Sequence, residues 1–137
     1  FRTDPTELYH MMQNMYYYYM NCLKETGWFG TKVCSYKMFK EYNFDGLRNM
    51  KTKGIQVPHG GWHFTFLGGP ERVKHKIESW GHQEFNNDFI KANVEENMKN
   101  GRDIFYRPGS TFNKVEIDES YPLYLRGNLD KYKEFIL

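Results

Sequence analysis

The chain contains 137 residues, of which 39% are hydrophobic and 18% aromatic. This length predicts a single domain over residues 1–137, or part of one, with one modest hydrophobic core. The 19 basic and 17 acidic residues leave a net charge of only +2, which argues against a nucleic-acid-binding surface. No apolar run approaches the roughly 18 residues of a membrane-spanning helix, so we expect no membrane segment. The sequence begins at Phe1 without a signal-like segment, and we expect a piece of a longer protein.

The first strand-like segments lie in the N-terminal third of the chain. Residues 8–23 are rich in tyrosine and predict a long strand buried on both faces. A helix that begins near Glu7 competes for the first half of this segment. Residues 24–27 predict a turn, and residues 30–36 alternate enough to predict a second strand.

The middle of the chain predicts short elements. Residues 38–42 and 45–50 are typical of short helical turns. Residues 55–58 predict a short strand. Residues 62–67 predict the clearest strand of the chain, because glycine pairs bound it on both sides.

Two helices are predicted next. Residues 70–80 form the first, since Pro70 suits a first helical turn and apolar residues recur on one face. Asn87 and Asp88 can cap a second helix, which ends at Gly101. The residues of this second helix that we expect to face inward are Phe89, Ile90, Val94 and Met98.

The C-terminal part predicts a short extended piece at residues 103–107 and a terminal helix over residues 129–137. Leu129, Tyr132 and Ile136 fall on one side of that helix. Together, the mixture of short strands and helices predicts an α/β or α+β layer fold.

Cys22 and Cys34 are the two cysteines, and their spacing fits no zinc site. Both lie in aromatic-rich segments, so buried free thiols are the default expectation. A disulfide between them is the alternative, and two cysteines do not fix the redox compartment.

His63 lies in the middle of the predicted strand, between Trp62 and Phe64. A histidine on a rigid strand, beside glycines that let a ligand approach the backbone, is a candidate metal or phosphate contact. The alternative is a core histidine with both ring nitrogens hydrogen-bonded.

The segment that contains His82, Glu84 and Asn86 lies on a loop between the two predicted helices. Glu84 is a candidate general base toward a hydroxyl group. The more frequent role for such a residue is a first-turn carboxylate that complements the helix dipole. Asn86 is either a helix N-cap or a hydrogen-bonding partner of a sugar hydroxyl.

Charged and aromatic residues elsewhere are candidates for substrate binding. Arg107 and its neighbour Asp103 flank an aromatic stretch, and arginine is suited to a diphosphate or carboxylate. Solvated surface arginines are commoner. Trp28 and Trp62 can stack on a sugar ring, with burial in the core as the alternative.

Several blocks of residues occur together in one order. They are residues 16–22, 28–34, 61–69, 76–79, 82–86 and 101–105. In this order they resemble glycosyltransferase family 17, whose characterised member adds N-acetylglucosamine to a mannose of N-glycans. The resemblance covers nearly the whole chain, from Tyr16 to Leu137.

The resemblance implies an α/β chain that forms the C-terminal part of a GT-A-like nucleotide-sugar transferase fold, with a mixed sheet flanked by helices. It further implies a UDP-GlcNAc donor, a glycan acceptor, a divalent metal (Mn²⁺) and inversion at the anomeric carbon. Under it Glu84 is the candidate base, and His63 or His82 the candidate ligand of the metal or diphosphate. The residues that it makes candidates for substrate binding are Trp62, His82, Asn86, Asp103 and Arg107.

One departure from the family is marked. The sequence has no Asp-x-Asp, the segment that binds metal and donor in this family, and we expect it before Phe1 with the nucleotide-binding half. The alternative functions are a non-catalytic carbohydrate-binding module and an inactive fragment. An animal-type enzyme would work in the Golgi lumen, and a microbial or viral one in the cytoplasm, so the compartment stays open.

Overall fold

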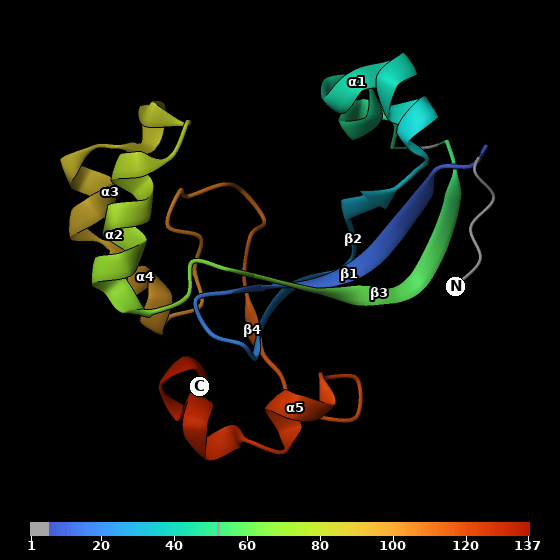
Figure 1. The fold of residues 1–137 in the computed structure, drawn as a ribbon. Coiled ribbons are helices and arrows are strands. Elements are labelled where there is room, and N and C mark those ends of the chain that lie inside the picture. Colours follow the sequence, from blue (N-terminus) through green and yellow to red (C-terminus); the bar gives the residue numbers. More distant parts are fainter. Residues whose placement is uncertain (1–5, 52) are drawn as a thin grey trace. The chain divides into compact units, whose positions relative to one another are not determined.

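The computed structural model describes residues 6–51 and 53–137, which form an α/β arrangement. An open four-stranded sheet has the order β3-β1-β2-β4 and is flanked by helices (Figure 1). The strands are β1 (Tyr9–Tyr17), β2 (Cys22–Val33), β3 (Ile55–Thr65) and β4 (Asn113–Lys114). The prediction of an α/β chain with a mixed sheet flanked by helices is confirmed.

The sheet is mixed because β3 runs parallel to β1, whereas β4 runs antiparallel to β2. The Ile55 N–H donates to the Leu8 carbonyl (2.8 Å), and the Tyr18 N–H donates to the Thr65 carbonyl (3.1 Å). The first bond joins the starts of β1 and β3, and the second joins their ends, so the two strands run in the same direction. On the other side, Cys22 lies opposite Lys114.

Tyr18 ends the first strand earlier than the sequence predicted. Its φ of 66° lies in the left-handed region, so a continuous strand over residues 8–23 is wrong. The Tyr18 hydroxyl donates to the Arg102 carbonyl (2.9 Å) and accepts from the Ile104 N–H (3.1 Å). These bonds anchor the almost fully buried ring, and residues 18–21 return the chain as β2.

The second strand, β2, includes residues 24–27. The turn predicted at these residues is therefore wrong. Gly27 accommodates a φ of +71° inside β2, a conformation that costs little only for glycine. The predicted strand over residues 30–36 is correct only up to Val33.

The third strand joins the two short strands that we predicted separately. Its backbone is irregular within residues 59–61, where His59 has a φ of 53° and Gly61 a φ of +130°. A Cβ atom on Gly60 would lie only 2.7 Å from the Met11 Cα. The close approach at this glycine is therefore to β1 and not to a ligand.

The helix α1 (Tyr36–Asn49) has a kink at Asn43, whose φ is 52°. It is thus two short helical pieces, as predicted. Ser35 caps it by accepting a hydrogen bond from the Met38 N–H (3.2 Å). Leu47 is buried, whereas most other side chains of the helix are exposed.

The helix α2 (Gly69–Ser79) confirms the prediction for residues 70–80, with Pro70 in the first turn. Val73 and Ile77 are fully buried. A 3-10 turn, η1 (Gln83–Phe85), follows it. In Figure 1, α2 lies beside α3 (Asp88–Ala92) and α4 (Val94–Lys99).

The single helix predicted up to Gly101 is wrong, because Asn93 separates α3 from α4 with a φ of −100° and a ψ of 3°. The Asn93 side chain donates to the Phe89 carbonyl (2.7 Å), which competes with continuation of the helix. Asn87 caps α3 as expected, since its side chain accepts from the Ile90 N–H (2.9 Å). Phe89 is 65% exposed, so the prediction that it faces inward is wrong. The other three inward residues are buried as predicted.

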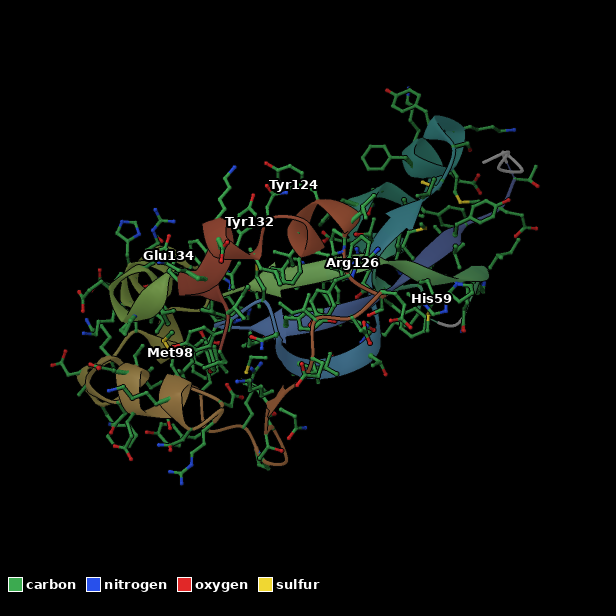
Figure 2. All side chains as sticks on the ribbon, turned by 90° about the horizontal axis from the view of Figure 1, so that it is seen from below. His59, Met98, Tyr124, Arg126, Tyr132 and Glu134 are labelled. Carbon is green, nitrogen blue, oxygen red and sulfur yellow. The ribbon has the colours of Figure 1, made fainter. Side chains whose placement is uncertain are left out.

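The C-terminal part consists of turns and short helical segments, α5 (Leu123–Arg126) and the 3-10 segment η2 (Leu129–Phe135). The extended piece predicted at residues 103–107 is a turn. Tyr124 and Tyr132, on α5 and η2, are labelled in Figure 2. Tyr121 and Leu125 of this part are buried and pack together with Tyr16 of β1.

The chain divides into two compact units, which we describe separately. The first consists of Phe1–Met15 and Thr26–His63, and the second of Tyr16–Glu25 and Phe64–Leu137. Cys22 is buried and Cys34 is partly exposed, and both thiols are free. The prediction that both thiols are free is confirmed. The prediction that both are buried is correct for Cys22 and wrong for Cys34. Across the part of the chain that the structure describes, no helix is long and apolar enough to cross a membrane.

Candidate functional site

The predicted site residues fall into both units. Trp62 and His63 belong to the first unit. The other candidates, all in the second unit, are His82, Glu84, Asn86, Asp103 and Arg107.

In the first unit, the His63 ring packs against Trp28, with 4.2 Å between the ring centroids. The neighbouring Trp62 is 38% exposed. No group of three or more histidine, cysteine, aspartate or glutamate side chains converges as a metal site anywhere in the described residues. His63 thus has an aromatic contact with Trp28, and in the described residues it belongs to no group of three His, Cys, Asp or Glu side chains of the kind that holds a zinc-like divalent metal.

In the second unit, His82 and Glu84 form a hydrogen-bonded pair at the start of η1. The His82 Nδ1–H donates to Glu84 Oε1 over 2.8 Å, and the two side chains are 56% and 60% exposed. The pKa of Glu84 is lowered, first by a hydrogen bond from its own backbone N–H and then by the bond from His82. An ionised carboxylate is thus held in a fixed position and open to solvent.

Asn86 is the C-cap of η1 and not the N-cap of α3, because Asn87 occupies the N-cap position. Its side-chain amide donates to Gln83 Oε1 (2.9 Å). The Asn86 Oδ1 atom is buried and has no hydrogen-bond partner among the described residues. The N-cap role is therefore wrong, and bonding to a sugar hydroxyl stays a prediction.

Asp103 and Arg107 form an ion pair in the turn after α4, in which the aspartate is buried and the arginine is partly exposed. The Asp103 side chain is 2% exposed and that of Arg107 is 41% exposed. The carboxylate accepts from Arg107 Nε, from Arg107 Nη2 (3.1 Å) and from the Phe105 N–H (3.1 Å). The pair raises the pKa of Arg107, chiefly through its hydrogen bond to Asp103. Asp103 thus orients Arg107, and the guanidinium is the member that solvent can reach.

These polar groups surround an aromatic cluster, which we define as Phe66, Trp80, Phe85 and Phe105. Its ring centroids lie between 4.5 Å (Phe85 to Phe105) and 6.2 Å (Phe66 to Trp80) apart. The His82 ring lies 4.4 Å from that of Trp80, and the Arg107 guanidinium 5.2 Å from that of Phe105. The structure therefore brings residues from three separate sequence blocks to one cluster.

Lys76 is a further charged residue at the aromatic cluster that the sequence analysis did not single out. Its ammonium lies 4.2 Å from the centroid of the Phe66 ring and donates to Thr65 Oγ1 (2.8 Å). Desolvation lowers the pKa of Lys76, and within the described residues no carboxylate forms an ion pair with it. In the sequence, Lys76 could have been found from its position one helical turn before Trp80, because this spacing places the lysine beside the apolar face of the helix.

Comparison of the chain with models of known protein families, with curated proteins and with solved structures finds no match.

Proposed function

We propose that this chain is part of an inverting glycosyltransferase, resembling family 17, that transfers N-acetylglucosamine from UDP-GlcNAc to a glycan acceptor. The proposal includes a GT-A-like fold as the finer description of the α/β arrangement. It is supported by the ordered sequence blocks that carry the resemblance. The observation that carries it is the exposed His82–Glu84 pair at the aromatic cluster.

In the proposed reaction, an acceptor hydroxyl oxygen attacks the anomeric carbon of the donor sugar. A new carbon–oxygen bond forms while the bond from that carbon to the diphosphate oxygen breaks, and UDP leaves with the electron pair. The hydroxyl proton passes to the Glu84 carboxylate. The Glu84 carboxylate is ionised at neutral pH and can accept a proton, although its lowered pKa makes it a weaker base than an unperturbed glutamate.

Positive charge at the aromatic cluster supports the same proposal. Lys76 and Arg107 both lie against rings of the aromatic cluster. Cations in such a position stabilise the negative charge that develops on a departing diphosphate. Asn86 is the proposed contact to sugar in the second unit, by hydrogen bonding. Trp62 belongs to the first unit and is by itself a proposed stacking contact to sugar.

Manganese belongs to the proposal only as an assay requirement. Because the described residues around His63 do not fit a metal, no step is assigned to a metal held by them. Transfer measured with and without Mn²⁺ tests the requirement directly.

The test of the proposal is release of UDP from UDP-GlcNAc with a mannose-containing N-glycan as acceptor. Glu84→Gln should abolish transfer and leave donor binding intact, since the amide cannot accept the proton. The matched control is Glu78→Gln, which removes a nearby carboxylate that pairs with Lys91 and should leave transfer unchanged. The assay uses the chain joined to its expected nucleotide-binding half. Turnover retained by Glu84→Gln would contradict the assignment of the base, and no transfer by that complete, unaltered protein would contradict the function.

The second candidate function is a carbohydrate-binding module, which the exposure of Trp62 on β3 favours. Aromatic faces stack on the C–H groups of sugars without any catalysis. This module would bind oligosaccharides in the absence of donor and metal, and Trp62→Ala would remove that binding. If titration detects neither glycan nor donor, the chain is an inactive fragment.

A further inference from the structure

A cavity of about 630 Å³ lies between β2 and α1, within the first unit. It contains none of the residues assigned to the proposed transfer reaction. Its size falls in the range of small-molecule binding sites. The residues that line it are Trp28, Phe29, Gly30, Lys32, Cys34, Phe39, Phe44, Leu47, Arg48, Asn49 and Lys51.

Aromatic rings from two elements line this cavity. Trp28 and Phe29 come from β2, and Phe39 and Phe44 come from α1. Phe44 is 64% exposed and Phe39 is 42% exposed, so a large part of their ring surface remains open to solvent. Flat aromatic ligands bury such surface favourably and add ring–ring contacts worth more than the area alone.

The charged residues that line the cavity are all basic. Lys32, Arg48 and Lys51 are its cations, and no aspartate or glutamate is among its lining residues. Within residues 6–51 and 53–137 none of the three forms an ion pair with a carboxylate. Basic groups without acidic partners favour an anionic occupant.

Lys32 has a structural task that leaves the other two cations for a ligand. Its ammonium donates to the carbonyl oxygens of Leu47 (2.7 Å) and Arg48 (3.2 Å), and so fixes the C-terminal end of α1 to β2. Desolvation and, second, the charge of Lys51 lower the pKa of Lys32. Lys51 therefore lies close enough to add to the positive potential at this end of the cavity.

We propose that the cavity between β2 and α1 binds an aromatic organic anion, with its ring among Trp28 and the phenylalanines and its acidic group at Arg48 and Lys51. Both features are needed for recognition. The rings supply the apolar contact, and the cations select the charged ligand over a neutral one of the same shape. This inference is independent of the proposed transferase activity, because it uses neither Glu84 nor the aromatic cluster.

The test compares two fluorescent probes that share an arylated naphthylamine body, anilinonaphthalene sulfonate and the neutral phenylnaphthylamine. The sulfonate should bind with an affinity about tenfold higher, which corresponds to one charge-assisted contact. The double variant Arg48→Gln, Lys51→Gln should remove that advantage and leave binding of the neutral probe unchanged. The matched control is Lys40→Gln, a cation of the same helix that does not line the cavity.

Cys34 supplies a second measurement, which does not depend on any variant in the charged residues. Because this thiol lines the cavity, the bound sulfonate should slow its reaction with a thiol reagent by several fold. Equal affinity for the two probes, an equal loss in Lys40→Gln, or an unprotected Cys34 would each overturn the proposal. Near-ultraviolet circular dichroism of each variant tests whether its fold is retained. If a variant does not fold, the protection of Cys34 in the unaltered protein alone tests the proposal.

Discussion

Glu84 has a lowered pKa because two hydrogen bonds favour its ionised form, the larger from its own backbone N–H and the smaller from His82. His82→Ala removes the smaller one, so the pKa of Glu84 should rise part of the way toward its usual value. Titration of the carboxyl carbon by nuclear magnetic resonance measures this directly. Since the folded-state pKa is the lowered one, the associated stabilisation exists above the unfolded-state pKa and disappears as the pH falls through the folded-state pKa.

His75→Ala is the matched control for this measurement, because His75 is an exposed histidine of α2 that makes no contact with Glu84. It should leave the titration of Glu84 unchanged. An unaltered pKa in His82→Ala would show that the hydrogen bond between His82 and Glu84 does not persist in solution. Only the backbone N–H of Glu84 would then lower the pKa of the proposed base.

At the residue scale, the sequence was most informative where local chemistry decides the outcome. Asn87 and Pro70 were recognised because capping and first-turn preferences depend on a few neighbours. The contact of His63 with Trp28 was not predicted, since Trp28 lies on another strand and no spacing along the chain relates the two. Lys76 was missed for the same reason, because the ring under its ammonium is known only from the fold.

At the scale of elements, α2 was predictable because its apolar residues repeat with helical spacing. The turn predicted at residues 24–27 failed because its glycine, Gly27, serves as an irregularity inside β2 instead of ending it. The break at Asn93 was equally hidden, since the apolar pattern of Ile90, Val94 and Met98 continues across it. Periodicity thus reports which face is buried, and it does not report whether the backbone is continuous.

Gly101 terminates α4 and provides a test at this scale. Its N–H donates to the Met98 carbonyl (3.3 Å), the next N–H, that of Arg102, donates to the Asn97 carbonyl (2.8 Å), and its φ is +58°. A Cβ atom there would lie 2.6 Å from the Phe112 carbonyl oxygen. Gly101→Ala should therefore lower the free energy of unfolding by about 1–2 kcal/mol from backbone strain, and by more if Phe112 cannot move.

Gly81→Ala is the control for this substitution. A Cβ atom at Gly81 meets no atom within 4 Å, and the backbone there is outside the left-handed region. Urea unfolding should separate the two variants in midpoint while leaving the slope alike. Equal stabilities would mean that the end of α4 relaxes without cost, and that Phe112 does not constrain it.

At the scale of the whole molecule, the class of fold was predictable from alternating strand-like and helix-like segments, whereas the order of the strands was not. The pairing of β3 with β1 connects segments that are far apart in the sequence. The aromatic cluster depends on the same long-range folding, because Phe66 and Phe105 lie in different blocks. Its composition could therefore not be derived from spacing along the chain.

The two cysteines allow the folded state of the molecule to be followed unit by unit. Cys22 is 1% exposed in the second unit, and burial raises its pKa to about 11. Cys34, in the first unit, is partly exposed. At pH 8 only about one thousandth of Cys22 would be thiolate, the reactive form, so the native protein should give one rapid reaction with a thiol reagent.

The second reaction should wait for unfolding of the unit that contains Cys22, so its rate should rise with urea while the first stays nearly constant. Cys34→Ser should remove the rapid phase, and Cys22→Ser the slow one. If both thiols reacted rapidly in the native protein, the packing around Cys22 would open without global unfolding. The protection of Cys22 therefore measures the free energy that holds the second unit together, because its thiol is reached only when that packing is lost.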